Sequence, residues 1–403
     1  MMMPLDVLLI ILVLCTVHAK LSCAELAILS SLESPEFKQG RAIDALGEAV
    51  FVAGSGVTAV NVSKRHELEV ADTLHDTALQ NCEAIYAYAS TWGHTRLAVA
   101  CADSLVILDA QVPANLQIVG AITAPDMLGG AMSVVVKDQL AFVASSRLDR
   151  VVSISLLDET KPEVLSYLQL SSATSVALLH EENKLLVGSG GRASRVTIIS
   201  YAPSGVFMKV GSVKDSRLSG PISRVHDVPN SELSIALSSA QGGTFVMLNT
   251  SAGIRPNIKY ALHSEGRYNS DVADGRATSW SPNGHKELGA AAGLCIARNG
   301  LAYVAASNVG AVCGVDMSSE GFRPNIVRVL FNQHLEGVVD ICVSEGEAMS
   351  RMLMLRNDRA TMHTQSVKFY ALNPRLGSII VLIDSDETNI VNNVVLSNSK
   401  WEF

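Results

Sequence analysis

The stretch LAFVASSRLDRVVSISLLDETKPEVLSYLQL, at residues 140–170, shows the pattern from which most of the chain is built. A short apolar strand is followed by a turn of small and polar residues, and a second apolar strand then ends near Asp158. A turn containing Pro162 leads into a third apolar run, and another such run, AMSVVV, precedes the stretch at residues 131–136. Short Val-rich runs separated by polar turns are typical of β-strands in antiparallel sheets.

The strand–turn–strand element recurs along the 403 residues, and most intervals between successive copies are 43 to 50 residues, with one of 68. A spacing of about 45 residues is the length of one four-stranded propeller blade. A strand-like run precedes each copy and an outer strand follows, so the sequence predicts an all-β, seven-bladed β-propeller of four-stranded antiparallel blades. Six or eight blades are the alternatives. The copies begin at Ala49, Leu97, Leu140, Lys184, Leu233, Leu301 and Arg351.

The closure of the ring is left open by the sequence. ELAILSSL (25–32) has the pattern of an outer strand that precedes the first full blade, and SIIVLID (378–384) has that of the last blade's outer strand. NIVNNVVLSN (389–398) has the pattern of a further inner strand. Either terminus could complete the seam blade, so one of these segments is surplus to seven blades.

Two stretches resemble a known family, the LVIVD-repeat propellers: ILDAQVPANLQIVGAI (107–122) and ISLLDETKPEVLSYLQL (154–170). In both, a strand ending in Asp runs into a proline-containing turn and then into another strand. The resemblance extends over about residues 26–396 and is sharpest in these two stretches. It implies a propeller at the cell surface or outside cells, and it implies little about chemistry.

Composition and the N-terminus bear on partners and location. The chain is 48% hydrophobic with a net charge of −8 and has no basic run, which argues against nucleic acid as a partner. Residues 7–17 form an apolar core of signal-peptide length, although residues 1–5 lack the usual Lys or Arg. We expect a signal peptide at 1–19, with cleavage after Ala24 as the alternative, and no other membrane insertion. An uncleaved signal anchor is the competing interpretation.

The predicted organisation is therefore a signal peptide, a single propeller domain at 25–396 with a loop insertion at about 263–287, and a tail at 397–403. Export predicts a secreted or cell-surface protein in an oxidising compartment, where disulfides form. Cys82 and Cys101 are the closest pair in sequence among the cysteines left after cleavage. Buried free thiols are the alternative for all of them. Asn61 and Asn249 match the glycosylation acceptor pattern.

Candidate site residues lie on the inner strands, which line the channel of a propeller. Aligning these strands places two carboxylates, Asp44 and Asp340, in neighbouring blades after closure, where they could hold a hard cation such as Ca²⁺ or share a proton. The interpretation that we favour is that each carboxylate bonds nearby backbone. Arg224, His226 and Asp227 form a second polar cluster. The aligned positions are Asp44, Tyr86, Ser133, Ser175, Ser223, Leu294 and Asp340.

The insertion at 263–287 is the most individual feature of the chain, and its Gly, Ser, Asn and Asp content predicts a loop. Tyr268 and Trp280 could anchor a partner there. Its Asp and His residues match no established metal-site spacing, so no metal ligand is assigned and no cofactor is identified beyond the Ca²⁺ hypothesis.

Two functions follow from these features. The sequence contains no nucleophile elbow, no H-E-x-x-H and no phosphate-binding loop. We therefore expect a non-enzymatic binding scaffold for a protein or glycan partner. The alternative is a hydrolase or lyase with a carboxylate or metal site at the channel mouth.

Overall fold

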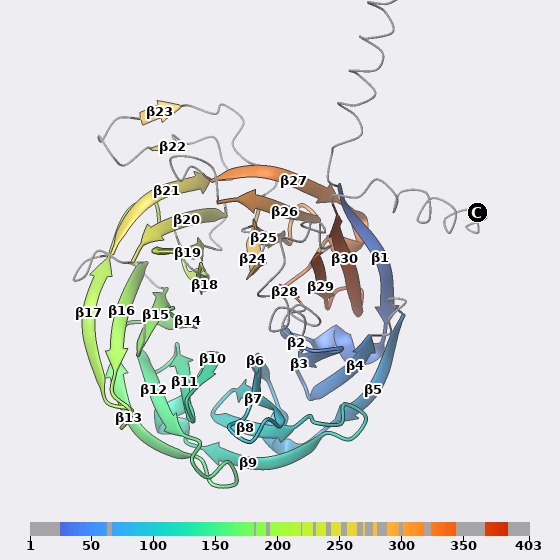
Figure 1. The fold of residues 1–403 in the computed structure, drawn as a ribbon, viewed down its shortest axis with the longest axis vertical. Coiled ribbons are helices and arrows are strands. Elements are labelled where there is room, and N and C mark those ends of the chain that lie inside the picture. Colours follow the sequence, from blue (N-terminus) through green and yellow to red (C-terminus); the bar gives the residue numbers. More distant parts are fainter. Residues whose placement is uncertain are drawn as a thin grey trace, which may run out of the picture.

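The computed structural model describes residues 25–62, 67–180, 183–190, 194–218, 220–228, 231–238, 243–250, 256–263, 269–270, 277–279, 288–297, 301–317, 324–343 and 367–385. Seven four-stranded antiparallel sheets stand radially around a central axis (Figure 1). The predicted all-β, seven-bladed propeller is confirmed.

The first four blades follow one another along the chain, and within each blade the strands run in sequence order from the axis to the rim. Blade 1 contains β2 (Ala42–Leu46), β3 (Ala49–Ala53), β4 (Val57–Val62) and β5 (Leu68–Leu74). Blade 2 contains β6 (Cys82–Ala89), β7 (Thr95–Cys101), β8 (Ser104–Asp109) and β9 (Gln117–Thr123). Blade 3 contains β10 (Ala131–Lys137), β11 (Leu140–Ser145), β12 (Arg150–Ser155) and β13 (Glu163–Gln169). Blade 4 contains β14 (Ala173–Leu178), β15 (Lys184–Ser189), β16 (Arg195–Tyr201) and β17 (Phe207–Val213).

The remaining blades include the one that closes the ring. Blade 5 contains β18 (Ile222–Asp227), β19 (Leu233–Ser238), β20 (Thr244–Asn249) and β21 (Asn257–His263). Blade 6 contains β24 (Ala291–Ile296), β25 (Leu301–Ala306), β26 (Ala311–Asp316) and β27 (Asn325–Phe331). Blade 7 contains β28 (Asp340–Val343), β29 (Val367–Asn373), β30 (Ser378–Ser385) and, at the rim, β1 (Glu25–Glu33).

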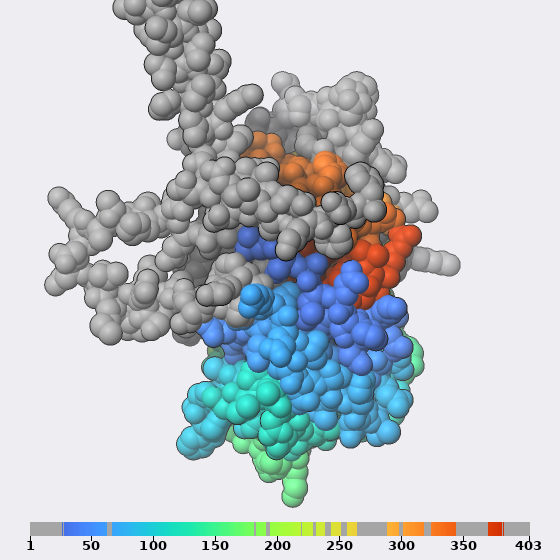
Figure 2. Space-filling model, turned by 90° about the vertical axis from the view of Figure 1, so that its right-hand side faces the viewer, coloured from blue at the N-terminus to red at the C-terminus, as the bar shows by residue number. Residues whose placement is uncertain are grey.

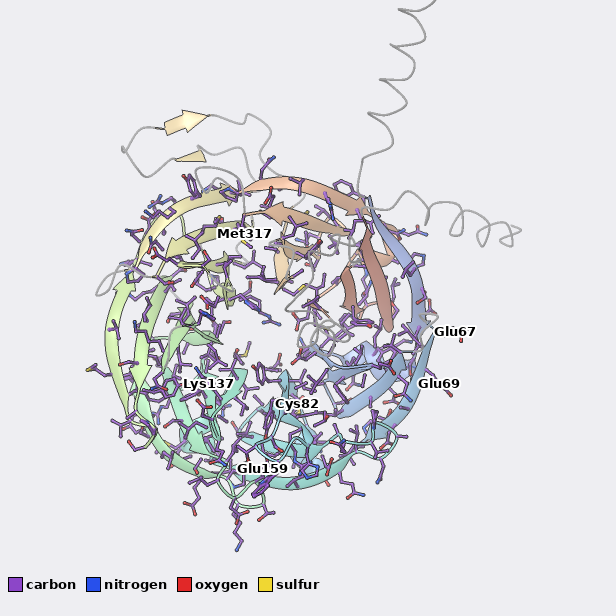
Figure 3. The ribbon with its side chains drawn as sticks, in the orientation of Figure 1. Glu67, Glu69, Cys82, Lys137, Glu159 and Met317 are labelled. Atoms are coloured by element: carbon purple, nitrogen blue, oxygen red, sulfur yellow. A yellow bond between two sulfur atoms is a disulfide. The ribbon has the colours of Figure 1, made fainter. Side chains whose placement is uncertain are left out.

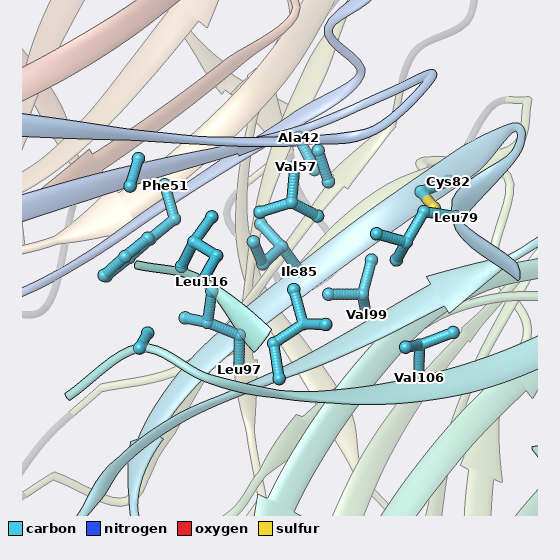
Figure 4. Close-up of a cluster of buried hydrophobic side chains, with 14 of the residues drawn as sticks. Ala42, Phe51, Val57, Leu79, Cys82, Ile85, Leu97, Val99, Val106 and Leu116 are labelled. Carbon is cyan, nitrogen blue, oxygen red and sulfur yellow. The ribbon is translucent and has the colours of Figure 1, made fainter. Parts of the chain in front are cut away.

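The hydrophobic core lies between the blades. Both faces of each blade are covered by its neighbours, so middle strands such as β3 and β11 are buried along their whole length. The outer strands β13 and β27 instead alternate between exposed and half-buried residues, because one of their faces meets solvent. Figure 4 shows the cluster between blades 1 and 2, where Phe51 packs with Leu97 and Leu116.

The N-terminal strand closes the ring. β1 pairs antiparallel with β30, so segments from the two ends of the chain lie side by side in blade 7 (Figures 1 and 2). The strand at 25–32 is therefore the outer strand of blade 7, and the strand at 378–384 is the third strand rather than the outer one. The segment at 389–398 lies outside the described residues.

The predicted repeat is right for six copies and wrong for the last. The second strands of blades 1–6 lie at the predicted copies, but the second strand of blade 7 begins at Val367 rather than Arg351. The physical reason is that β1 supplies the fourth strand, which leaves the run at 367–373 to act as the second strand. Residues 344–366 lie outside the described part of the chain.

A disulfide joins Cys82 to Cys101, the pair closest in sequence, which lie directly opposite each other in β6 and β7 of blade 2 (Cys82 is labelled in Figure 3). Of the two alternatives that the sequence left open, the structure has the disulfide at this pair. The other described cysteines, Cys295, Cys313 and Cys342, are buried and lie outside this disulfide. Within the insertion at 263–287, β22 (Asn269–Ser270) and β23 (Ala277–Ser279) form a two-stranded antiparallel sheet. No helix in the described ranges is long and apolar enough to cross a membrane.

Candidate functional site

The candidate site lies on the face of the disc where the inner strands begin, here called the upper face. In each blade, the second-to-last residue of the second strand pairs with one residue of the inner strand. These seven inner-strand residues occupy equivalent positions around the ring. These positions are Ile43, Ala84, Ser133, Ser175, Arg224, Gly293 and Asp340.

The alignment made from sequence is therefore right at Ser133, Ser175 and Asp340 and wrong elsewhere. Asp44, Ser223 and Leu294 lie one residue from the equivalent position, and Tyr86 lies two residues away. The inner strands of blades 2–6 each contain a register shift just before this position, whereas the inner strand of blade 1 has none. A one-residue bulge does not interrupt the apolar pattern, so sequence counting cannot place it.

The carboxylates of Asp340 and Asp44 bond the backbone of the next blade. Asp340 Oδ2 accepts a hydrogen bond from the Ile43 N–H at 3.3 Å, which joins blade 7 to blade 1. Asp44 Oδ2 accepts from the Ala87 N–H at 2.7 Å, which joins blade 1 to blade 2. Both carboxylates thus bond backbone N–H groups of the neighbouring blade. This agrees with the interpretation favoured from the sequence, that each carboxylate bonds nearby backbone.

Serines make the corresponding bonds on the other side of the ring. Ser133 Oγ accepts from the Val176 N–H at 3.1 Å, and Ser175 Oγ accepts from the Val225 N–H at 3.0 Å. Ser223 Oγ donates to Leu237 O within its blade at 3.2 Å and to Ala291 O of blade 6 at 3.5 Å. We call these side-chain bonds from one inner strand to the next the blade locks.

Arg224 and Asp340 form an ion pair across an intervening blade. Arg224 Nη2 lies 3.1 Å from Asp340 Oδ2, and the Asp340 side chain is only 10% exposed. Gly293 occupies the equivalent position in the blade between them. A Cβ there would lie 2.8 Å from Asp340 Cα, so only glycine allows the two inner strands to approach this closely.

The predicted cluster of Arg224, His226 and Asp227 forms only in part, because Arg224 lies apart from the other two. Arg224 turns to Asp340, whereas Asp227 ends its strand on the opposite, lower face and accepts from the His180 N–H at 2.5 Å. The Nδ1–H of His226 donates to Asp227 O at 2.8 Å. Burial raises the pKa of the Asp227 carboxyl above its ordinary value. Tyr86 is half-buried and packs in the core between inner strands.

Two buried thiols lie in the inner strands near these carboxylates. Burial raises the pKa of Cys342 well above the usual thiol value, and the charges of Asp44 and Asp340 raise it further. Cys295 is affected in the same way by burial and by Asp340. Both side chains therefore remain protonated at neutral pH, which disfavours thiolate chemistry. Among the residues that the structure describes, no three His, Cys, Asp or Glu side chains are grouped so as to hold a metal ion.

A second set of contacts between blades lies on the lower face, where Glu159 of blade 3 reaches blade 2 (Figure 3). Arg96 Nε donates to Glu159 Oε2 at 2.8 Å, and Tyr88 Oη donates to Glu159 Oε1 at 3.1 Å. Burial and then the Glu159 charge raise the Tyr88 pKa. Glu159 lies in the stretch at 154–170, in the turn between β12 and β13, so this turn connects neighbouring blades.

A cavity of about 380 Å³ opens on the upper face at the seam, and we call it the seam pocket. It is formed where the loop entering blade 1 meets the start of blade 2 and the turn between β29 and β30. Its charged lining residues are Lys38, Arg41, Arg375 and Glu83. Sequence reasoning missed all four, because the pocket combines residues from both ends of the chain and no local motif marks them.

Four predicted residues, Tyr268, Trp280, Asn61 and Asn249, stay predictions. Tyr268 and Trp280 lie outside the described residues. Asn61 is exposed at the lower end of β4, where a glycan could be attached, and Asn249 is half-buried near the end of β20. Glycosylation at either position stays a prediction, as does the binding of Ca²⁺.

Comparison with known proteins supports the fold alone. No family model and no curated protein sequence matches the chain. Among solved structures, the chain is similar to the Kuenenia stuttgartiensis hydrazine synthase, at 14% identity and a TM-score of 0.60, with 87% of this chain and 96% of that chain covered. It is also similar to Saccharomyces cerevisiae Sqt1, at 12% identity and a TM-score of 0.56, with 89% and 98% covered.

Proposed function

We propose that the chain is an exported, non-enzymatic β-propeller that binds a protein or glycan partner on its upper face. The observation that carries this proposal is the use of Asp44 and Asp340. Each carboxylate accepts a backbone N–H of the next blade, and Asp340 also pairs with Arg224. Acid–base catalysis or metal binding would need those oxygens, so the structure favours a supporting role for them.

The same face offers a place to bind. The seam pocket has the size of a small-ligand site and lies where loops from three blades meet. Its walls are backbone turns fixed between blades, for example by the bond from the Cys82 N–H to Gly54 O at 2.8 Å. A rigid pocket on a rigid disc loses little conformational freedom when a partner binds.

Export is supported by the disulfide and by the position of the closing strand. The Cys82–Cys101 bond is expected to persist in an oxidising compartment. Cleavage after either Ala19 or Ala24 would leave β1 intact, because this strand begins at Glu25. N-terminal sequencing of the protein recovered from a secreting host tests this part, and a mature N-terminus inside β1 would contradict it.

The experiment that tests the scaffold against the enzyme alternative is calorimetric titration of the purified protein with Ca²⁺ and with Zn²⁺. The wild type is compared with the Asp44→Asn/Asp340→Asn double variant, which removes both charges and keeps an oxygen acceptor at each position. The proposal expects no stoichiometric uptake by either protein. Stoichiometric uptake by the wild type that the double variant loses would move the assignment to a metal-dependent hydrolase or lyase.

A further inference from the structure

We propose that the seam pocket binds carboxylate side chains, supplied by an acidic segment of a polypeptide partner. This inference rests on the proposed binding function and specifies its chemistry. The first observation is charge. The chain as a whole carries −8, yet the described residues that line this cavity include three cations and one acid. A cationic concavity in an acidic protein concentrates anions locally, whereas the acidic remainder of the surface repels them.

The second observation is that two of the cations are available. Lys38 and Arg41 are exposed, and neither side chain has a hydrogen bond or an ion pair within the described structure. Arg375, on the opposite wall, pairs with Glu336 in a short contact. That guanidinium therefore already binds a carboxylate, and its planar fork suits a second carboxylate oxygen.

The third observation is that the fold fixes the stems of Lys38 and Arg375 and the backbone at Arg41. Phe37 is fully buried beside Lys38, and the Arg41 N–H donates to Ala53 O at 2.8 Å. Gly377 and Gly337 have positive φ, and a Cβ on them would lie 2.8 Å from Lys38 Cγ and 3.0 Å from Arg375 Cβ. The turn glycines thus pack against the stems of both long side chains, which lowers the entropy lost when an anion binds.

The rest of the lining favours a peptide over other anions. Glu83 adds a negative charge that would repel a compact dianion such as phosphate, whereas separated carboxylates can avoid it. Asn81 and Ser55 offer polar groups for a backbone, and Val339 and Pro374 offer apolar contact. Among the described lining residues none is aromatic, which disfavours stacking of a sugar ring.

The test is calorimetric titration of the full chain at low ionic strength with a blocked peptide that carries three Asp residues separated by Gly and Ser. The control ligand is the same peptide with Asn in place of each Asp. We expect binding of the acidic peptide only, weakened about tenfold in Arg41→Gln, which corresponds to about 1.4 kcal/mol. Lys38→Gln should also weaken binding of the acidic peptide, and added salt should weaken this binding in every variant that shows it.

The matched control variant is Arg195→Gln. Arg195 begins β16 on the same face of the disc and likewise has no partner in the described structure, but it lies in blade 4, outside the pocket. This variant should bind the acidic peptide as the wild type does. Because the side chains of Arg41 and Arg195 have no hydrogen bond or ion pair within the described part of the chain, we expect equal melting temperatures, which separate binding from folding.

Four results would overturn the inference. These are no binding of the acidic peptide by the wild type, equal binding of the Asn peptide, an unchanged affinity in Arg41→Gln, and an equal loss in Arg195→Gln. Tighter binding of inorganic phosphate or of a glucuronate oligosaccharide would overturn the polypeptide assignment. The proposed function fails separately, through metal uptake at Asp44 and Asp340, so the two failures are distinguishable.

Discussion

The seam side of the ring and the side opposite it perform the same structural task with different chemistry. At the seam, Asp340 and Asp44 bond the next inner strand, whereas Ser133 and Ser175 do so in blades 3 and 4. The carboxylates add charge, an ion pair to Arg224 and a cationic pocket nearby. The comparison teaches that conspicuous acids at a propeller mouth can be structural, and that binding groups can lie beside them.

The largest expected effect is at Asp340. Asp340→Ala leaves the Ile43 N–H and the Arg224 guanidinium without their common acceptor, and Asp340 is nearly buried. We expect a loss of about 3–5 kcal/mol in the free energy of unfolding, measured by urea denaturation. Ser175→Ala removes a neutral lock and should cost about 1 kcal/mol. Equal losses of unfolding free energy in Asp340→Ala and Ser175→Ala would show that the seam side and the opposite side of the ring do not differ in this respect.

The disulfide gives blade 2 a covalent link where its equivalent inner-strand position, Ala84, has no polar side chain. The bond closes a loop between residues 19 apart, for which the chain-entropy relation predicts about 3 kcal/mol. A Cys82→Ala/Cys101→Ala variant should therefore unfold at lower urea than the wild type. A variant as stable as the wild type would show that the noncovalent contacts of blade 2 suffice.

Gly293 tests the close approach of blades 6 and 7. In Gly293→Ala the new Cβ would lie 2.8 Å from Asp340 Cα and from Ile341 N, and backbone atoms cannot move aside easily. We expect a loss of about 2 kcal/mol in unfolding free energy. Gly190→Ala in blade 4 is the matched control, because its nearest neighbours are at 3.3 Å and it should cost less. The reverse order would contradict the account of the seam.

The smallest effect is a pH dependence at Asp227 on the lower face. Burial raises the pKa of this carboxyl in the folded state, so the folded protein binds its proton more tightly than the unfolded chain does. Its contribution to stability is therefore greatest below the ordinary Asp pKa and is lost as pH rises through the raised value. Asp227→Asn should reduce this slope, measured as unfolding free energy against pH. An unchanged profile would show that Asp227 is not responsible.

How far the sequence could predict the molecule depended on how local each feature was. The blade number and six of the seven second strands followed from a repeat of local strands and turns. The register of the inner strands did not, because the bulge before Ala84 or Arg224 adds a residue without changing the apolar pattern. Closure by β1 was one of two alternatives that the sequence left open, and the seam pocket was missed, since each joins segments more than 300 residues apart.

The most direct test of the central claim, that the mouth carboxylates lock the blades together, is amide hydrogen exchange resolved at Ile43 and Ala87. The account predicts slow exchange of both amides in the wild type. Asp340→Ala should accelerate exchange of the Ile43 amide, and Asp44→Ala should accelerate exchange of the Ala87 amide. Asp340→Asn should leave the Ile43 amide largely protected, because the Asn side chain keeps an oxygen acceptor. Unchanged protection of Ile43 in Asp340→Ala and of Ala87 in Asp44→Ala would show that the carboxylates do not hold the blades, and would return them to consideration as catalytic or metal-binding groups.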